Sequence, residues 1–282
     1  MIFMVKVNIQ SRLVECNVDK IGETYMKYLN DVNYKDCVGK VCKSKSSGDF
    51  KIVKYNNTAN VEIRFLKTGF ETVTQLGNIR NGNVKDPYSP SVYGIGVLGN
   101  KHPITINGVL TREYKLWTSM LVRCYSDNFK KRQPTYEGCE VSDKFKSYEY
   151  FYEWCNKQIG FNNDEWHLDK DLLVKGNKVY SEKTCVFLPN EINSLLTRRE
   201  ALRGKHLIGV YWRNTKKAFV AQVNKNKGKS EWLGSFKTEL EAFNAYKTAK
   251  EYFVKEQANK WKGKIDERAY EALMNYTVEI TD

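Results

Sequence analysis

The stretch that decides the fold of the C-terminal region is GVYWRNTKKAFVAQVNKNKGKSEWLGSFKTELEAFNAY, residues 209–246. It contains three short alternating segments, residues 209–213, 218–223 and 230–236, which are separated by polar turns rich in Asn, Gly and Lys. Short alternating segments with polar turns between them are typical of an antiparallel meander. The sequence therefore predicts a three-stranded antiparallel sheet.

A helix is predicted to follow this sheet. Thr238 is a suitable N-cap, and Glu241, three residues later, is placed to complete a capping box. An apolar stripe follows at helical spacing, with which the helix can pack on one face of the sheet. The residues of this stripe are Ala242, Ala245, Tyr246 and Ala249.

The same region is strongly basic. Between Arg198 and Lys229 there are ten Lys or Arg residues and one acidic residue, Glu200. Cations bind phosphate, amide and guanidinium groups bind base edges, and a β-ribbon fits a major groove, so duplex DNA is the expected partner. The alternative is that the aromatic rings only pack and the cations only solvate the sheet. The residues expected to contact DNA are Trp212, Arg213, Lys216, Lys217, Gln222 and Trp232.

Residues 206–250 resemble the DNA-binding domain of plant ethylene-response factors. That resemblance implies that the sheet lies in a DNA major groove, with Arg213, Lys217, Gln222 and Trp232 as contacts. Tyr211-Trp212 replace the Arg and polar residue that are usual in the plant proteins, so base specificity is not carried over. The matching residues are Gly209-Val210, Phe219-Val220-Ala221, Trp232-Leu233-Gly234-Ser235-Phe236, Thr238, Glu241-Ala242 and Ala245-Tyr246.

Length and composition set the broad class of the protein. The 282 residues suit two or three domains, and the net charge of +13 favours a polyanionic partner. No run of about eighteen apolar residues occurs, so no membrane span is expected. The seven cysteines form no Cys-x-x-Cys pair, which is typical of reduced thiols in a cytosolic protein and does not favour a structural zinc site.

The N-terminal part is expected to be a small β-rich accessory domain over residues 1–85. A short strand and a helix around Ile21–Leu29 are predicted first. Alternating segments at residues 37–42, 50–55, 61–65 and 70–76 then predict a small barrel or curled sheet. Residues 86–111, rich in Gly, Asn and Pro, are expected to form a linker.

Residues 112–200 are predicted to contain helices followed by a strand–turn–strand–helix unit. Apolar residues recur at helical spacing over residues 114–124, and a second helix is expected over 147–158. From Trp166 a strand leads to a polar turn at Gly176-Asn177, a second strand and a helix that begins near Pro189. On the first strand, alternation places His167, Asp169 and Asp171 on one face and Lys170 on the other.

This region resembles the HNH homing endonucleases of bacteriophages, whose frame is a β-hairpin followed by a helix. The resemblance implies a ββα-metal domain that cleaves or nicks DNA, in the cytoplasm of a phage-infected bacterial host. The matching residues are Trp117, Met120, Arg123-Cys124-Tyr125, Tyr136-Glu137-Gly138, Phe151, Leu168-Asp169-Lys170, Gly176, Tyr180-Ser181 and Cys185.

By position in the family motif, Asp169 and Asn193 would be the ligands of one divalent ion. A carboxylate and an amide oxygen suit Mg²⁺ or Mn²⁺ better than zinc. In the family, the residue after the aspartate is usually His, which acts as the general base, or Arg. Here it is Lys170, which in its protonated state would be suited to phosphate binding. His167, two residues away on the face of Asp169, is then the candidate base.

The expected fold class is α+β with several domains: a small N-terminal β domain, a central ββα-metal domain and, over residues 206–282, a three-stranded sheet with a helical tail. The expected function is metal-dependent, site-directed DNA cleavage. The alternative is a non-catalytic DNA-binding regulator built on a decayed HNH core, which is favoured by Lys170 and by Thr184 in place of the family asparagine. A third possibility is a counter-defence protein that binds a bacterial partner through the N-terminal domain.

Overall fold

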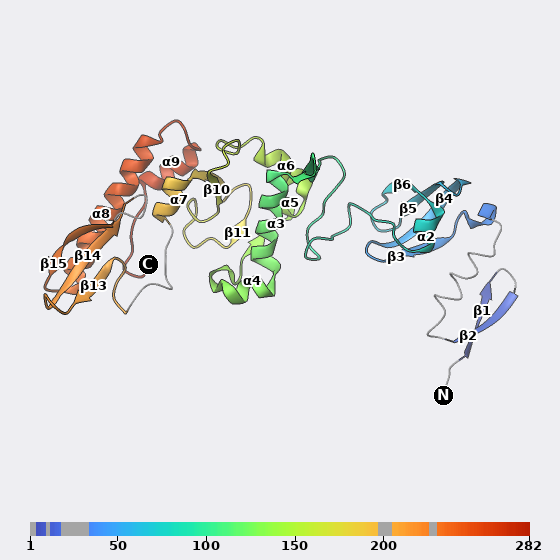
Figure 1. The fold of residues 1–282 in the computed structure, drawn as a ribbon, viewed down its shortest axis with the longest axis horizontal. Coiled ribbons are helices and arrows are strands. Elements are labelled where there is room, and N and C mark those ends of the chain that lie inside the picture. Colours follow the sequence, from blue (N-terminus) through green and yellow to red (C-terminus); the bar gives the residue numbers. More distant parts are fainter. Residues whose placement is uncertain (1–3, 10–11, 18–33, 197–204, 226–229) are drawn as a thin grey trace. The chain divides into compact units, whose positions relative to one another are not determined.

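The computed structural model describes residues 4–9, 12–17, 34–196, 205–225 and 230–282 (Figure 1). The chain divides into two compact units, Met1–Asn100 and Lys101–Asp282. Helices and several separate sheets occur in it, which confirms the predicted α+β class. In the described part of the chain, no helix is long and apolar enough to cross a membrane.

The first unit contains a hairpin and a four-stranded antiparallel meander. Strands β1 (Met4–Ile9) and β2 (Arg12–Asn17) pair with each other, so the hairpin replaces the single strand that was expected. The helix predicted around Ile21–Leu29 lies outside the described residues. The meander consists of β3 (Val41–Ser44), β4 (Gly48–Asn57), β5 (Asn60–Phe65) and β6 (Glu71–Thr74).

The meander buries one face, on which α2 (Leu76–Arg80) packs. Alternation along β4 and β5 places Phe50, Ile52 and Ile63 in this core. The short 3-10 helix η2 (Tyr34–Cys37) precedes the first strand of the meander and includes Cys37, which the sequence had suggested as the start of a strand. The other three predicted segments each overlap a strand of the meander.

The segment expected to be a linker begins as part of the first unit. Asp86 is buried and accepts hydrogen bonds from Thr68 Oγ1 at 2.5 Å and from Ser89 Oγ at 3.1 Å. Beyond the unit boundary at Asn100, the short strands β7 (Thr105–Ile106) and β8 (Val109–Leu110) form a hairpin.

A helical layer follows this hairpin in the second unit. Its helices are α3 (Arg112–Tyr125), α4 (Asp127–Arg132), α5 (Asp143–Lys146) and α6 (Tyr148–Cys155), with the 3-10 helix η3 (Pro134–Tyr136) between α4 and α5. Thr111, Ser126, Ser142 and Ser147 each accept a backbone N–H at the start of one of the four α-helices, which explains where these helices begin. The aromatic residues Trp117, Tyr148 and Phe151 are fully buried between them, as the helical spacing predicts.

A strand–strand–helix unit follows, with a pairing that differs from the predicted one. Strand β10 (Trp166–Asp169) pairs antiparallel with β12 (Val186–Pro189), and α7 (Asn190–Leu196) comes directly after. The strand after the Gly176-Asn177 turn, β11 (Val179–Tyr180), pairs instead in parallel with β9 (Glu140–Val141). The prediction of a tight hairpin at Gly176-Asn177 is therefore wrong. All four residues of β12 are buried, whereas Val179 of β11 is exposed.

The C-terminal sheet has the predicted form. Strands β13 (Val210–Arg213), β14 (Ala218–Asn224) and β15 (Ser230–Phe236) are antiparallel in that order. Helix α8 (Glu239–Lys260) begins with the predicted capping box of Thr238 and Glu241, and α9 (Glu267–Met274) completes the helical tail.

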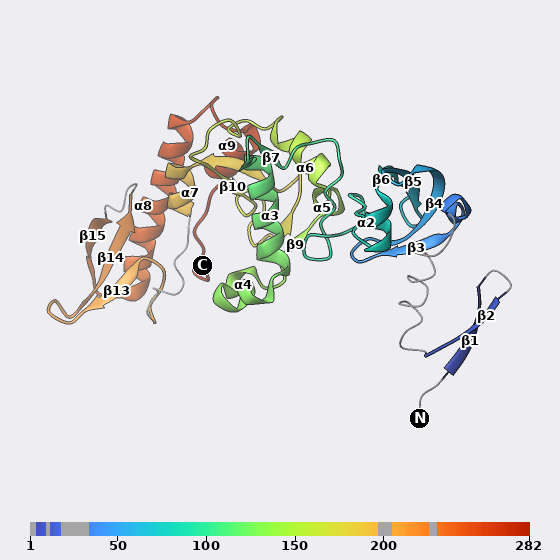
Figure 2. The same ribbon diagram turned by 45° about the vertical axis from the view of Figure 1, so that its right-hand side comes forward.

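One face of this sheet is covered by α8 (Figure 2). Ala242, Phe243 and Tyr246 pack against Ala221 and Val223 in a single cluster. The backbone of β13 approaches the helix so closely that a Cβ on Gly209 would lie 2.0 Å from Cδ2 of Tyr246, and Gly209 has a φ of +76°. Both facts require glycine at this position.

Candidate functional site

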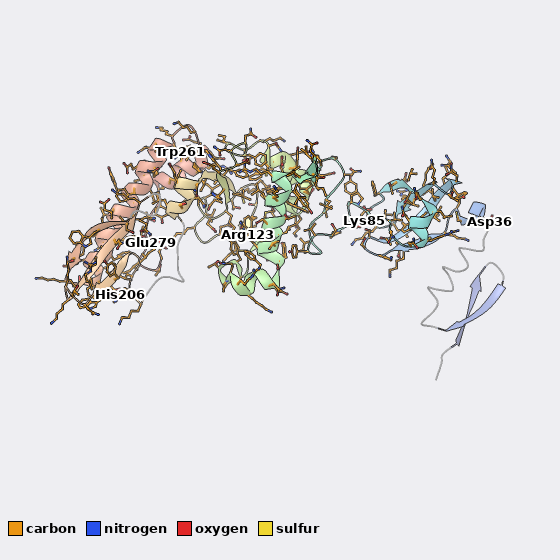
Figure 3. All side chains as sticks on the ribbon, viewed as in Figure 1. Asp36, Lys85, Arg123, His206, Trp261 and Glu279 are labelled. Carbon is orange, nitrogen blue, oxygen red and sulfur yellow. The ribbon has the colours of Figure 1, made fainter. Side chains whose placement is uncertain are left out.

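A cleft of about 920 Å³ opens beside the β10–β12–α7 unit. His167 and Asp169 on β10, Lys170 directly after it and Asn193 on α7 all line this cleft. Helix α3 contributes the wall that carries Arg123 (Figure 3), and residues after α9 border another side. The structure thus brings together all the residues that the sequence singled out for metal binding and catalysis.

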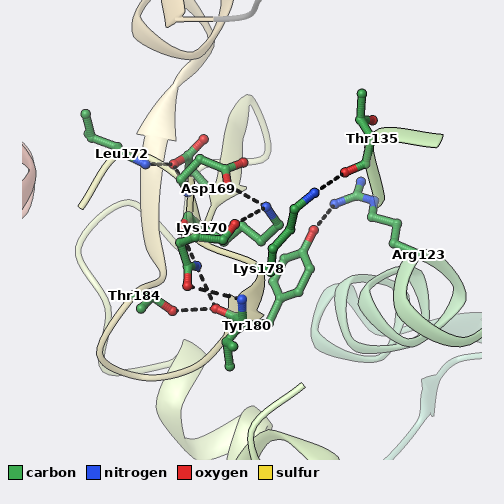
Figure 4. Close-up of polar contacts among 11 residues, drawn as sticks. Arg123, Thr135, Asp169, Lys170, Leu172, Lys178, Tyr180 and Thr184 are labelled. Atoms are coloured by element: carbon green, nitrogen blue, oxygen red, sulfur yellow. Dashed lines mark hydrogen bonds and ion pairs between the residues drawn. The ribbon is translucent and has the colours of Figure 1, made fainter. Parts of the chain in front are cut away.

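Asp169 is held in a defined orientation at the end of β10. Its Oδ1 accepts backbone N–H groups from Asp171 at 2.9 Å and Leu172 at 2.8 Å (Figure 4). Burial raises the pKa of this carboxyl, and the nearby Asp171 carboxylate acts in the same direction. Within the described part of the chain, Oδ2 has no hydrogen-bond partner. A fixed carboxylate with one oxygen available suits a hard cation.

Lys170 points to the other side, as alternation predicts, and is only 7% exposed. Its Nζ donates to Asp171 Oδ1 at 2.5 Å and to the carbonyl of Asn177 at 3.0 Å, and it lies 5.6 Å from the centre of the Tyr180 ring. These three contacts hold the ammonium within the loop that follows β10. Lys170 therefore stabilises the loop, an arrangement that favours neither a general-base role nor the phosphate contact suggested by the sequence.

His167 lies on the exposed side of β10. It pairs with Leu188 of β12 across the ladder, and its side chain is open to solvent. Only Leu168 separates it from Asp169 on the same strand, so both side chains project toward one side. Its place in the cleft wall makes it accessible to a ligand that enters there.

Asn177 is a residue whose role the sequence did not indicate. Its Nδ2 donates to the carbonyls of Lys170 at 2.7 Å and Val179 at 2.8 Å, and its Oδ1 accepts from the backbone N–H of Val179 at 3.1 Å. Thr184 Oγ1 adds a hydrogen bond to the carbonyl of Val179 at 2.7 Å. Together they close the loop that carries Lys170. The only sequence signal was the turn residue itself, since Asn favours local backbone hydrogen bonds.

The outer face of the C-terminal sheet, opposite α8, carries most of the predicted DNA contacts. Gln222 pairs with Trp232, whose ring is 56% exposed, and Lys216 Nζ lies 5.1 Å from the centre of that ring. Alternation places Arg213 on this face with Tyr211, whose ring it covers at 5.8 Å. Val220, between these side chains, is fully buried, so polar and aromatic groups surround an apolar centre.

Trp212 and Lys217 are placed differently from the others. Trp212 pairs with Phe219, and the two rings meet edge to face at 4.8 Å on the side of the sheet that α8 covers. It remains 41% exposed at the end of that face. Lys217 lies in the turn before β14 with a positive φ of 47°, and its side chain is exposed. The predicted contacts therefore do not share one surface.

The two residues predicted to bind a metal ion both carry oxygen donors. Among the residues that the structure describes, no group of three or more His, Cys, Asp or Glu could hold a metal ion. Asp169 and Asn193 line the same cleft and offer one carboxylate and one amide oxygen. Mg²⁺ usually takes one or two protein oxygen ligands and completes its shell with water and phosphate, so this pair fits Mg²⁺ or Mn²⁺.

Comparisons of the chain with models of protein families, with curated proteins and with solved structures gave no match.

Proposed function

We propose that this protein is a metal-dependent DNA endonuclease of the phage HNH homing type, which cleaves or nicks duplex DNA. One observation carries the proposal. His167, Asp169 and Asn193 line a single cleft, on a unit in which two antiparallel strands precede a helix. The same order of elements is the frame of the ββα-metal nucleases that residues 112–200 resemble.

Asp169 and Asn193 would hold one Mg²⁺ or Mn²⁺ ion. When bound, such an ion supplies the charge sink for the phosphate oxygens and the leaving oxygen. Asp169 suits this role because two backbone N–H groups fix Oδ1, while Oδ2 has no partner among the residues that the structure describes. Asn193 is brought to the cleft by α7, which β12 leads into directly.

His167 is the general base of the proposed reaction. Its imidazole takes a proton from the attacking water as the water oxygen forms a bond to phosphorus. The opposite P–O ester bond breaks, and the leaving oxygen takes a proton from solvent. Lys170 does not replace His167 in this step, since its ammonium is engaged by Asp171, by the Asn177 carbonyl and by the Tyr180 ring.

The C-terminal sheet supplies affinity and register in this proposal. Arg213, Gln222 and Trp232 on its outer face would contact the duplex, and Lys216 and Lys217 would bind phosphate from the adjoining turn. Such contacts weaken as salt concentration rises, because counterions must be displaced. The proposed place of action is the cytoplasm of a phage-infected bacterium, where thiols stay reduced; the six cysteines from Cys37 onward are free and buried.

A non-catalytic DNA-binding regulator is the second candidate. The observation that favours it is the commitment of Lys170 to the loop at the position where HNH enzymes usually place the catalytic His. The two candidates share the DNA-binding sheet and differ only in what the cleft does.

A cleavage assay separates the two candidates. A supercoiled plasmid library of bacteriophage genomic inserts is incubated with the protein and Mg²⁺ or Mn²⁺, beside the Asp169→Ala variant. The endonuclease proposal expects nicked or linear plasmid with wild type and intact plasmid with the variant, at equal DNA affinity. Intact plasmid with wild type under both metals, while DNA binding is retained, would favour the regulator.

A further inference from the structure

Four Lys or Arg side chains line the cleft, and three of them pair with carboxylates. Arg112 pairs with Asp164 at 3.5 Å, Lys170 with Asp171 at 2.5 Å and Lys175 with Asp282 at 2.9 Å. Arg123 is the fourth, and among the described residues no carboxylate lies within ion-pair distance of it. The cleft therefore contains one cation whose charge is not balanced within the described part of the chain.

The guanidinium of Arg123 is held in place without losing its charge. Its Nη1 donates to the hydroxyl of Tyr180 at 3.4 Å, and its Cζ lies 5.7 Å from the centre of the Tyr136 ring. Burial acts to lower the pKa of Arg123, but the hydroxyls of Tyr180 and Tyr136 outweigh it and the pKa is raised. The group is thus a fixed cation that keeps most of its five N–H donors.

Arg123 is connected to the metal-ligand strand on both sides. The ring of Tyr180, its hydrogen-bond partner, also lies against the ammonium of Lys170, the neighbour of Asp169 (Figure 4). At the other end of α3, Arg112 Nη2 donates to the carbonyl of Trp166 at 2.8 Å, which fixes the start of β10. These contacts tie the helix that carries Arg123 to β10 and to the loop after it.

We propose that Arg123 binds a backbone phosphate of the DNA strand that enters this cleft and so positions that strand against Asp169. The inference rests on the proposed nuclease function. A planar guanidinium stacked on an aromatic ring offers paired N–H donors that match the oxygens of a phosphate. A phosphate would also balance the charge of Arg123, which no carboxylate of the described residues pairs with.

The test combines Arg123→Met with DNA in which single phosphates near the cut are replaced, one at a time, by neutral methylphosphonates. For wild type, replacement at one position should lower kcat/KM roughly ten- to a hundredfold, the range of a lost hydrogen bond to a charged group. Arg123→Met should show a similar loss on unmodified DNA and little further loss at that position. Arg123→Lys should recover part of the activity. Arg132→Met, which removes an exposed arginine on α4 outside the cleft, is the matched control and should behave as wild type.

The same combinations of protein variant and modified DNA are also compared by equilibrium binding. Each variant then carries Asp169→Asn as well, so that no strand is cut. If the loss of affinity caused by Arg123→Met and the loss caused by a methylphosphonate are additive at every position, Arg123 contacts none of these phosphates. This result would overturn the proposal whether or not wild type cleaves. Another outcome is that wild type binds DNA and never cleaves it, while at one position Arg123→Met and the methylphosphonate together cost no more affinity than either alone. In that case the nuclease function is wrong and the phosphate contact is supported. Equal melting temperatures of Arg123→Lys and wild type are required, so that a folding defect is not mistaken for a lost contact.

Discussion

The ammonium group of Lys250 on α8 donates a hydrogen bond to the backbone carbonyl of Leu195, in the last turn of α7. Further along the same helix, Lys260 pairs with Glu191, in the first turn of α7, at 2.9 Å. Helix α8 therefore holds both ends of the short helix that carries Asn193, while its first turns pack on the C-terminal sheet. The sheet and the helix that carries Asn193 thus share one support.

Replacing Lys250 tests this shared support. Lys250→Met keeps the buried methylenes but removes the donor, leaving the Leu195 carbonyl without this hydrogen bond at a cost of about 1–3 kcal/mol. We expect a lower melting temperature, faster hydrogen exchange in α7 and a larger loss of cleavage than of DNA affinity. Lys255→Met, at an exposed position of the same helix, should change none of these. Unchanged exchange in α7 would show that α8 does not hold it.

Asp169→Asn should stabilise the metal-free protein at neutral pH. Burial raises the pKa of the Asp169 carboxyl in the folded state. A raised folded-state pKa contributes stability that is present below the unfolded value of about 3.9 and is lost as the pH rises through the folded-state value. At pH 7 the buried carboxylate is therefore a net cost, whereas Asn keeps the oxygen that accepts the two N–H groups.

Thermal unfolding in the presence of a chelator measures this effect. The variant should melt above wild type at pH 7, and the difference should shrink as the pH falls toward the ordinary range of aspartate. Added Mg²⁺ should raise the melting temperature of wild type and not that of the variant, because only a bound ion stabilises the folded state. An equal effect of Mg²⁺ on both proteins would remove Asp169 from the ligand set.

Asn177→Ala should loosen the loop after β10. The change removes three hydrogen bonds to the backbone of Lys170 and Val179. Removing partners from backbone groups costs about 1–3 kcal/mol for each group that is left buried and unsatisfied. We expect reduced cleavage with DNA affinity retained, measured by plasmid nicking and by gel shift. Asn162→Ala, at an exposed position before β10, is the control; equal activity of the two variants would contradict the role of Asn177.

Substitution of the two tryptophans of the sheet should affect different properties: DNA affinity for Trp232 and thermal stability for Trp212. Trp232→Ala removes an exposed ring on the outer face and should weaken DNA affinity about tenfold, as loss of a contact worth more than 1 kcal/mol does, with little change in melting temperature. Trp212→Ala removes the ring that packs on Phe219 beside α8 and should lower the melting temperature more than the affinity. Fluorescence anisotropy with labelled duplex and thermal unfolding measure the two effects. The reverse result would mean that the duplex lies against the other face.

Much of the C-terminal sheet could be predicted because its signals are local. Alternation over residues 209–236 and the polar turns specify three strands, and the Thr238–Glu241 pair specifies where α8 begins. The same alternation also assigns Trp212 to the face of Val210, which packs under α8. Because successive side chains of a strand alternate, Arg213 lies on the opposite face from Trp212, which is the face that α8 does not cover.

The sequence by itself determined the three strands of the C-terminal sheet, the capped start of α8 and the helical spacing of α3 and α6, because strand period, helical period and cap chemistry depend on neighbours in the chain. The residues of the candidate metal site were indicated by the family resemblance. Only the tertiary structure decided that β10 pairs with β12, that Lys170 is enclosed by Asp171, Asn177 and Tyr180, and that α8 supports α7 as well as the sheet. Strand pairing and side-chain partners of this kind depend on which apolar surfaces are buried together across the whole unit, and short-range patterns do not contain that information.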